Sequence, residues 1–565
     1  MSYRPPLEAI EHVLTHVSQL HGVLRSKQFD SCGPEEVWAI LEAIAKFAAS
    51  EIAPLRRIGD LEGARLEEGR VLMPRGYKEA YASFVEGSYG SIAASPNFGG
   101  LGLPHSVELA ALELMGGADM AFGLCPILTS GSVDALLHHG SNEQQQRYLS
   151  KLVSGEWTGT MNLTEPQAGT DVGAVRTMAT PGPDGRWSIR GTKIFISFGD
   201  HNLTSNIVHL ILARTPGASA GTRGLSLFVA PKFLVGDDGA LGEANGIKVA
   251  SLEHKLGLHA SPTCVLAFGE DDPCWGELVG QLHGGMRAMF TMMNNARLNI
   301  GLQGVQIAER ARQAAIAYAK DRIQSRPASG DNALPVPIIE HPDVRRMLIR
   351  MTALTHAARA LIYFAALQRD HENMGSRSAS GRLELLTPLA KAYATDVGNE
   401  VASLAIQVHG GAGYVEETGV AQLLRDVRIT SIYEGTNGIQ AADLVMRKIG
   451  LHEGEAFSAL MLQMKREARK SELLSLIRCC ADLGNDLAKA PAIDRLSASY
   501  PFLTMLSVAV SGWLLERMLS AELTELHRTS IQYYLECIVP EAMGHKASAS
   551  PAAASIFAIG SSEFD

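Results

Sequence analysis

The sequence predicts a mainly α-helical protein with a central β domain, and three observations support this fold class. Before residue 157 the apolar residues recur every three or four positions, as in amphipathic helices. Between residues 157 and 283 they gather in short runs rich in Ile, Val and Phe, separated by Gly, Pro and Asp, which is typical of β-strands. The helical period then returns and continues towards the end of the chain. The predicted order is therefore helices, strands and helices.

Five regions are expected along the chain. They are an N-terminal extension (1–40), an N-terminal helical domain (41–157), a central β domain (158–283), a C-terminal helical bundle (284–450) and an additional helical domain (451–565). The helical signal is clearest in six segments: 38–55, 107–128, 296–322, 383–410, 456–489 and 511–539.

The strands are expected in four runs: 187–199, 207–215, 224–231 and 264–269. Loops rather than helices separate these runs, so the pattern predicts antiparallel pairing and excludes a parallel doubly wound sheet.

Composition restricts the classes of function. The chain has 565 residues and a formal net charge of −10, and it lacks a cluster of Lys and Arg, so nucleic acid is not an expected partner. Seven cysteines without a C-x-x-C motif indicate a reducing, cytoplasmic setting. Neither a signal peptide nor a membrane span is expected, because the apolar run 503–515 ends at Glu516 and Arg517. The 18 histidines show no ligand spacing, so no metal site is predicted.

Four segments indicate a function together. The first two are 161-MNLTEPQAGTDVGA-174 and 191-GTKIFISFGD-200; the third is 318-YAKDRIQSR-326; the fourth runs from 404-LAIQVHGGAGY-414 through 425-RDVRITSIYEGTNGIQ-440. In this order and at these separations they resemble the acyl-CoA dehydrogenase flavoprotein family, over about residues 40 to 450. The two extra ends resemble its long bacterial subgroup, which includes methylthiopropionyl-CoA dehydrogenases.

The resemblance implies a function and a set of partners. It implies FAD-dependent α,β-dehydrogenation of an acyl-CoA, fatty or methylthio-substituted, to the trans-2-enoyl-CoA. It also implies FAD held between domains and subunits, a homodimer or dimer of dimers, and electron-transfer flavoprotein as acceptor. An acyl-CoA oxidase or a desulfinase on the same scaffold, and a non-catalytic flavoprotein, are the alternatives.

The first two segments supply the residues expected at the flavin. By resemblance Met161, Leu163 and Thr164 contact the flavin ring and Thr170 lies near the diphosphate or thioester. The alternative is a strand end followed by a turn. Phe195 stands where the family keeps an aromatic against the flavin, and Ser197 matches a hydroxyl near flavin N5, although a Phe in a strand is usually a core residue.

The third and fourth segments are expected to contact FAD across a dimer. Arg322 and Gln324 match residues that reach the neighbouring subunit's FAD, Arg322 by its fork of donors to the diphosphate. Ser325 departs from the Phe of many members, and the alternative for this segment is a helix end with solvated charges. Gln407, Gly410 and Gly411 match the adenosine-binding part of the family pattern.

Glu434 is the expected catalytic base. It follows Tyr433 and precedes a Gly-Thr-Asn turn, where an acidic residue is also favoured by a helix N-terminus, so a structural role is the alternative. By resemblance Glu434 removes the α proton, and its backbone N–H polarises the thioester oxygen. The rival position before Arg297 is Ala296, which has no titratable group.

Other residues complete the expected site. Gly435 belongs to the catalytic turn; Thr436 and Gly438 are assigned to the cofactor, although Gly438 replaces a common Gln and loses a side-chain contact. Arg297, Tyr433 and Phe122 are assigned to the substrate. Phe122 together with Pro126 is expected to shape the cavity floor and to favour a short or medium acyl chain.

Overall fold

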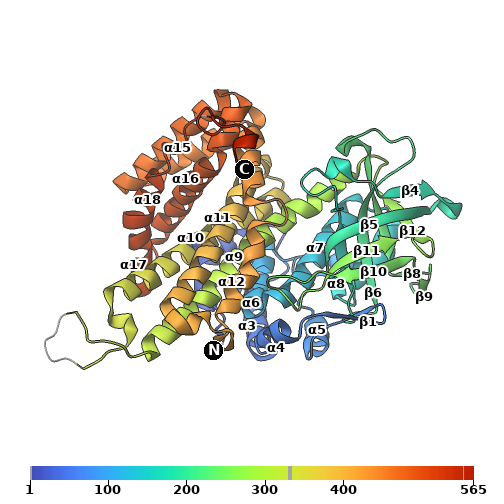
Figure 1. Cartoon of the computed structure of the whole chain (residues 1–565), viewed down its shortest axis with the longest axis horizontal. Helices are drawn as coiled ribbons and strands as arrows, with labels where there is room; N and C mark the ends of the chain where they lie inside the picture. The colour runs from blue at the N-terminus through green and yellow to red at the C-terminus, as the bar shows by residue number, and fades with distance from the viewer. Residues whose placement is uncertain (1–2, 329–333, 552, 565) are drawn as a thin grey trace. The chain divides into compact units, whose positions relative to one another are not determined.

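A computed structural model describes residues 3–328, 334–551 and 553–564 (Figure 1). The described residues form two compact units. The first unit comprises Met1–Ala39, Pro104–Glu113 and Arg297–Asp565, and the second comprises Ile40–Leu103 and Leu114–Ala296. Three helices contribute residues to both: α3 (Pro34–Phe47), α6 (His105–Ala118) and α9 (Gly285–Asp321).

The second unit contains helices around a sheet. Its own helices are α4 (Leu55–Glu62), α5 (Tyr77–Glu86), α7 (Met120–His139) and α8 (Asn142–Ser154). Polar side chains define where two of them begin. Asp119 accepts from the Ala121 N–H at the start of α7, and Ser141 forms a capping box with Gln144 at the start of α8. The helical signal at 107–128 therefore corresponds to two helices separated at Asp119.

The strands of the second unit form one large sheet and two hairpins. The sheet order is β10-β11-β5-β12-β7-β6-β3, and β4 pairs with β5 and β6; β1 pairs with β2, and β8 with β9. The bounds are β1 (Arg65–Glu67), β2 (Arg70–Leu72), β3 (Trp157–Asn162), β4 (Met178–Pro181), β5 (Trp187–Ser197), β6 (Asn206–Arg214), β7 (Leu225–Pro231), β8 (Phe233–Val235), β9 (Leu241–Ala244), β10 (Ile247–Leu252), β11 (Thr263–Phe268) and β12 (Cys274–Val279).

The expectation of antiparallel pairing is wrong at β6, which has two parallel neighbours. Strand β3 runs parallel to β6, from Trp157 beside Asn206 to Asn162 beside Ile211, and β4 touches β6 in the same sense. The connection from β3 to β6 is long and passes through β4 and β5, so the chain can return to the same end of the sheet before β6 begins. The four strand runs predicted from the sequence correspond to β5, β6, β7 and β11.

The sheet separates two apolar cores. One contains Leu136, Leu149, Leu210 and Met289 and lies between the sheet and α7 and α8; the other contains Ile189, Phe228, Leu266 and others on β5, β7 and β11. Strands β6 and β7 are buried on both faces, which explains their continuous apolar sequences. Packing on both faces keeps the sheet rigid, and this rigid sheet positions the turns that connect its strands.

The first unit is a helical bundle with the chain ends attached. Its bundle helices are α9, α10 (Pro342–Asn373), α11 (Arg377–His409), α12 (Ala421–Val427) and α13 (Asn437–Asp443). The N-terminal helices α1 (Leu7–His16) and α2 (Leu20–Leu24) belong to the same unit, and α1 packs against α10.

Residues 451–565, the C-terminal helical region, contribute further helices to the first unit. They are α14 (Glu455–Glu467), α15 (Ser471–Lys489), α16 (Ala492–Met518), α17 (Glu525–Tyr533) and α18 (Val539–Met543). Figure 1 shows α15, α16 and α18 side by side, and α16 also packs against α10, α11 and α13. The predicted helix at 511–539 is interrupted between Met518 and Glu525, where Thr524 caps α17.

Two helices among the described residues have the length and hydropathy of a membrane span. They are α7 and α16, and 78% and 83% of their most apolar windows are buried inside the protein. Such burial is usual for core helices of globular proteins, so these two helices are weak evidence for a membrane.

Candidate active site

Glu434 lies in a strained turn at the start of α13. The preceding 3-10 helix ends at Ser431, and Thr436 caps α13 by accepting from the Ile439 N–H at 3.2 Å. Between them Glu434 has a φ of +54° and Gly435 a φ of +84°. Positive φ costs free energy for a residue with a Cβ, and such residues often occur at functional sites. The backbone of Glu434 is therefore held in a left-handed conformation that residues with a Cβ seldom adopt.

Two side chains hold the carbonyl groups of this turn. Gln440 donates from Nε2 to the carbonyls of Glu434 and Gly435 at 3.3 and 3.4 Å. Lys391, a fully buried residue of α11, donates from Nζ to the Gly435 carbonyl at 2.9 Å. A Cβ at position 435 would lie 2.9 Å from Gln440 Nε2, so any larger residue would displace this amide in addition to adopting a φ that favours glycine.

The charges around Glu434 set its protonation. Burial raises the pKa of Glu434 above its ordinary value, while the positive charges of Arg297 and Lys391 act in the opposite direction. Burial lowers the pKa of Lys391 to about 8, although the carboxylates of Asp396 and Glu434 oppose this. A carboxylate whose pKa is raised, but restrained by nearby cations, is suited to accept a proton near neutral pH.

Several buried polar atoms around this turn have no hydrogen-bond partner among the described residues. They include Arg297 Nε and Gln303 Nε2 on α9, and Gln440 Oε1 and Asp443 Oδ2 on α13. The other end of the Gln303 amide accepts from the hydroxyl of Tyr433. Unpaired buried polar atoms are rare and costly, and a cluster of them is expected where a polar ligand binds. Arg297, Tyr433, Glu434, Gly435 and Thr436 thus belong to one polar site in the first unit.

The ends of α9 and α11 bring the two predicted adenosine and diphosphate segments together. The rings of Tyr318 and His409 stack at 4.3 Å, which places the chain leading to Arg322 beside the chain leading to Gly410. Five residues predicted to bind FAD are exposed here: Arg322, Gln324, Gln407, Gly410 and Gly411. Gly410 has a φ of +60° and a ψ of −140°, a combination open essentially to glycine alone.

In the second unit, the turn after β3 is fastened to β5 by a buried ion pair. Lys193 donates from Nζ to the Leu163 carbonyl and to Glu165 Oε1, both at 2.9 Å, and the Ile194 N–H donates to the Thr164 carbonyl at 2.9 Å. Burial opposes ionisation of Glu165, but Lys193 and other donors outweigh it and hold its pKa at about 2. Burial lowers the pKa of Lys193 to about 8, so both groups are charged at neutral pH.

Phe195 has an unusual conformation and exposure for an aromatic residue within a strand. Its φ is +59°, and its side chain is 60% exposed although it lies within a strand. It lies where the pairing of β5 with β11 changes register, between the pairs of Ile196 and Lys193, so a bulge turns the ring away from the core. Ser197 follows on the same strand beside Thr263, and Met161 and Leu163 are half-buried. An exposed aromatic ring beside a polar turn fits a planar cofactor.

Two predicted site residues of the second unit have different surroundings. Phe122 is 2% exposed and packs with Tyr77, Tyr81 and Phe84 at ring distances of 6.3 Å, so it belongs to an aromatic core in the free protein. Thr170 is exposed in the loop after β3.

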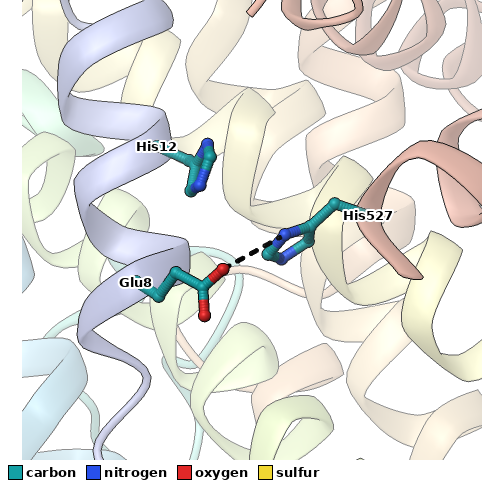
Figure 2. Close-up of side chains that lie close together, drawn as sticks. All are labelled: Glu8, His12 and His527. Atoms are coloured by element: carbon teal, nitrogen blue, oxygen red, sulfur yellow. Dashed lines mark ion pairs between the residues drawn. The ribbon is translucent and has the colours of Figure 1, made fainter. Parts of the chain in front are cut away.

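A histidine cluster outside this site could offer metal ligands. Figure 2 shows Glu8 and His12 on α1 and His527 on α17, whose ligand atoms lie within 4.8 Å of one another. However, burial and then the neighbouring His12 lower the pKa of His527, and the positive charges of Arg359 and Arg312, which act in the same direction, would also repel a cation. The hydroxyl of Thr524 also lies 3.0 Å from His527 Nδ1. We interpret the cluster as packing of α1 beside α17.

Comparison with known families decides the identity of this scaffold. Three family models match successive parts of the chain: "Acyl-CoA dehydrogenase, N-terminal domain" at 34–156, "middle domain" at 160–270 and "C-terminal domain" at 283–449. The chain belongs to the acyl-CoA dehydrogenase family. It is an oxidoreductase that acts on acyl-CoA thioesters, as the resemblance of its four motifs predicts.

Similar proteins cover the added ends as well. The 3-methylmercaptopropionyl-CoA dehydrogenase of Ruegeria pomeroyi is 45% identical over 96% of this chain and 95% of its own length. A butyryl-CoA dehydrogenase of Syntrophomonas wolfei is 38% identical over 77% of this chain and 73% of its own. This acyl-CoA dehydrogenase therefore aligns with the first relative over 96% of its length and with the second over 77%.

Solved structures confirm the fold. Caenorhabditis elegans ACDH-11 in complex with C11-CoA has a TM-score of 0.82 at 22% identity and covers 100% of this chain and 96% of its own. An acyl-CoA dehydrogenase complexed with FAD from Bacillus anthracis has a TM-score of 0.71 at 21% identity. The match covers 93% of this chain and 90% of the Bacillus anthracis chain. A third match, with a TM-score of 0.61 at 26% identity, is a chain from the structure entitled "Electron transferring flavoprotein of Acidaminococcus fermentans: Towards a mechanism of flavin-based electron bifurcation". The match covers 73% of this chain and 98% of that chain.

Sequence reasoning missed the residues that support the two turns. The sequence patterns do not single out Lys391, Asp396, Glu165 or Lys193, although the two lysines are charged residues within apolar segments. For Lys391 a signal exists: it falls on the apolar face of a helix, three residues after Pro388 and three before Ala394, where a lysine requires a buried partner.

Proposed function

We propose that this acyl-CoA dehydrogenase oxidises a short acyl-CoA, 3-methylmercaptopropionyl-CoA or a close analogue, with FAD as cofactor and Glu434 as catalytic base. The observation that carries the proposal is the strained Glu434 turn with Arg297 and Lys391 beside it. The substrate class is supported by the relative from Ruegeria pomeroyi, which matches the chain from end to end.

Glu434 performs the proton transfer. Formation of the α,β double bond breaks one C–H bond at each carbon, and the α proton leaves without its electrons. The α C–H group is a weak acid, so it needs a base stronger than an ordinary carboxylate. The raised pKa of Glu434 meets this need, because proton transfer is most efficient when the pKa of the base lies near the operating pH. FAD, when bound, supplies the two-electron acceptor for the hydrogen and electron pair that leave the β carbon. The α proton remains on Glu434 at the end of the step.

The turn also polarises the thioester. Lys391 and Gln440 hold the carbonyls of Glu434 and Gly435, so the neighbouring backbone N–H groups have fixed directions before substrate binds. Fixed donors stabilise the negative charge that develops on a thioester oxygen when the α proton is removed. We assign this role to the Glu434 N–H, and we assign substrate contacts to Arg297 and Tyr433. A substrate contact of Phe122 stays a prediction, because its ring is buried among other aromatic rings.

The residues of the second unit fit a flavin. The exposed Phe195 ring offers stacking area, and the rigid turn at Met161, Leu163 and Thr164 offers backbone donors and a hydroxyl. Ser197 and Thr170 are proposed to hydrogen-bond the same cofactor, as are Thr436 and Gly438 of the first unit. We expect Phe195→Ala to weaken FAD binding about tenfold, measured by fluorescence titration of the apoprotein. Unchanged FAD affinity would remove Phe195 from the site.

We further propose a homodimer that passes electrons to an electron-transfer flavoprotein. The exposed cluster of Arg322, Gln324, Gln407, Gly410 and Gly411 lies at one end of the bundle, together with Tyr414, whose side chain is 88% exposed. Exposed apolar and cationic groups at one place are suited to a partner subunit and its bound diphosphate. The similarity to a structure entitled for an electron-transferring flavoprotein supports that acceptor. A cytoplasmic location remains a prediction.

The experiment is an anaerobic titration of the FAD-loaded protein with propionyl-, 3-methylmercaptopropionyl-, butyryl- and palmitoyl-CoA. We expect rapid bleaching of the flavin band by 3-methylmercaptopropionyl-CoA, slower bleaching by butyryl-CoA and little by palmitoyl-CoA. Bleaching by palmitoyl-CoA alone would overturn the substrate class, and bleaching by none would overturn the proposed reaction. Peroxide formation in air would identify an oxidase, and release of sulfite from a sulfinate substrate would identify a desulfinase.

A further inference from the structure

A continuous series of hydrogen bonds connects the C-terminal helical region with the catalytic turn. The hydroxyl of Tyr500 on α16 lies 2.7 Å from Asp396 Oδ2 on α11. Asp396 Oδ1 accepts from Asn437 Nδ2 at 2.8 Å, and Asn437 Oδ1 accepts from Lys391 Nζ at 2.8 Å. Lys391 Nζ then donates to the Gly435 carbonyl at 2.9 Å. These four side chains form the relay.

The relay passes through positions that have little freedom. Asn437 is the first residue of α13 and is 3% exposed, and it also donates to Thr395 Oγ1 at 2.9 Å. Helix α16 packs directly against α13 and α11, so Tyr500 approaches the relay from a third helix. A buried amide with several partners holds one orientation, because any rotation leaves polar atoms unpaired. Movement of Asp396 is therefore transmitted to Lys391 through Asn437.

The charges near the relay favour a hydrogen-bond donor to Asp396, which is the role of the Tyr500 hydroxyl. Lys391 is a fully buried cation whose Nζ donates to the Gly435 carbonyl and to the Asn437 amide oxygen; the counter-charges that act on it are Asp396, beyond Asn437, and Glu434. Arg297 faces Lys391 and opposes its charge, and Arg428 faces Asp396 and Tyr500. Burial favours the neutral form of Asp396, whereas the Tyr500 hydroxyl favours the carboxylate. Tyr500 thus helps to keep the counter-charge of Lys391 ionised.

We propose that Tyr500 is a positioning residue, through which the C-terminal helical region holds Lys391, and with it the Glu434–Gly435 turn, in the geometry for proton abstraction. This inference rests on the proposed function of Glu434. It assigns a catalytic purpose to residues 451–565, which lie outside the three matched family models. A dehydrogenase without this region must hold the turn in another way.

The test uses Tyr500→Phe in the full-length, FAD-loaded enzyme, with Tyr534→Phe as matched control. Tyr534 also comes from the C-terminal region and donates to or accepts from a bundle residue, Tyr393, at 2.7 Å, but that pair is not part of the relay. Both variants remove one hydroxyl and keep the ring. We expect Tyr500→Phe to slow flavin reduction by 3-methylmercaptopropionyl-CoA about fivefold at unchanged substrate affinity.

The pH profile supplies a readout that a loss of packing would not change. If Asp396 becomes neutral, Lys391 loses its counter-charge and holds its proton less tightly, so Glu434 loses part of the effect that lowers its pKa. We therefore expect the acid limb of the reduction rate to move to higher pH in Tyr500→Phe and to stay in place in Tyr534→Phe. Adding Asp396→Asn to Tyr500→Phe should have less than the summed effect, because both act through one path.

Hydrogen exchange separates failure of the relay from failure of the proposed function. Amides of residues 434–440 should exchange faster in Tyr500→Phe than in the wild type or Tyr534→Phe, whether or not any thioester is oxidised. Equal exchange, or equal rates and pH profiles in an active enzyme, would overturn the relay. A wild type that no acyl-CoA reduces, with faster exchange in Tyr500→Phe, would overturn the reaction and leave the positioning role supported.

Discussion

Two charged clusters within the first unit are built differently. Arg359 on α10 is 1% exposed and donates to Glu113 Oε1 at 2.8 Å and to Glu309 Oε2 at 3.0 Å. Arg312 and the Tyr363 hydroxyl add further bonds to these two carboxylates. At the catalytic turn, Glu434 faces Arg297 and Lys391, yet Lys391 donates to a carbonyl and an amide oxygen, and Arg297 pairs with Asp443 at 4.0 Å.

The difference explains the opposite pKa shifts of Glu309 and Glu434. Burial opposes ionisation of Glu309, but Arg312 and Arg359 outweigh it, so the pKa of Glu309 is lowered. At Glu434 burial prevails over Arg297 and Lys391, and the pKa is raised. Direct pairing fixes a charge and serves the fold, whereas incomplete pairing leaves a group able to change its protonation and serves the reaction.

The largest expected effect on stability comes from breaking the paired cluster. Arg359→Met would leave Glu113 and part of Glu309 buried without their cation, at a cost of about 3–5 kcal/mol in the free energy of unfolding. Denaturant unfolding measures this cost. The control Arg346→Met removes a partner of Asp343 in an exposed pair and should cost less than about 1 kcal/mol. Similar losses in both variants would contradict the importance of direct pairing.

A smaller effect is expected from the backbone of the catalytic turn. Gly435→Ala places a Cβ at positive φ and against Gln440, which should cost about 1–3 kcal/mol of stability and also misdirect Glu434. Gly450→Ala is the control, because its φ is −96° and no atom lies within 4 Å of its added Cβ. Thermal unfolding with both proteins FAD-loaded gives the comparison. If Gly435→Ala is as stable and as active as Gly450→Ala, the turn is not strained.

The smallest expected change is a shift in pH dependence. The rate of flavin reduction should rise with pH as Glu434 loses its proton, through a pKa above that of an ordinary carboxyl group. Lys391→Met removes a positive charge that lowers this pKa, so the acid limb should move to still higher pH. Stopped-flow reduction across pH would show it. An acid limb that stays in place, or moves to lower pH, would exclude Lys391 from the electrostatics of the base.

Local sequence patterns predicted much of this molecule. The positions of β5, β6, β7 and β11 follow from their Ile-, Val- and Phe-rich runs, and the helix starting at Asn437 follows from the Gly-Thr-Asn turn after Glu434. The parallel pairing of β3 with β6 was not predictable in this way, because strand direction depends on the path of the connection and not on local composition. The proposed borders of the five regions stay a prediction.

The supporting residues could not be derived from the sequence for a related reason. Lys391 lies 43 positions before Glu434, and Tyr500 lies 104 positions after Asp396, so their contacts exist only after α11, α13 and α16 have packed. The conformation of Phe195 likewise depends on the register change between β5 and β11. Motif resemblance predicts which residues face the chemistry, and the fold shows which neighbours hold those residues in place.

The most direct test of the central claim is anaerobic flavin reduction by Glu434→Gln. The substitution keeps the size of the side chain and removes the base, so the FAD-loaded variant should keep its visible spectrum and thermal stability. Its rate of bleaching by 3-methylmercaptopropionyl-CoA should fall by about 10²–10⁴-fold relative to the wild type at equal FAD occupancy. Bleaching at the wild-type rate would show that another group removes the α proton and would contradict the assignment of Glu434.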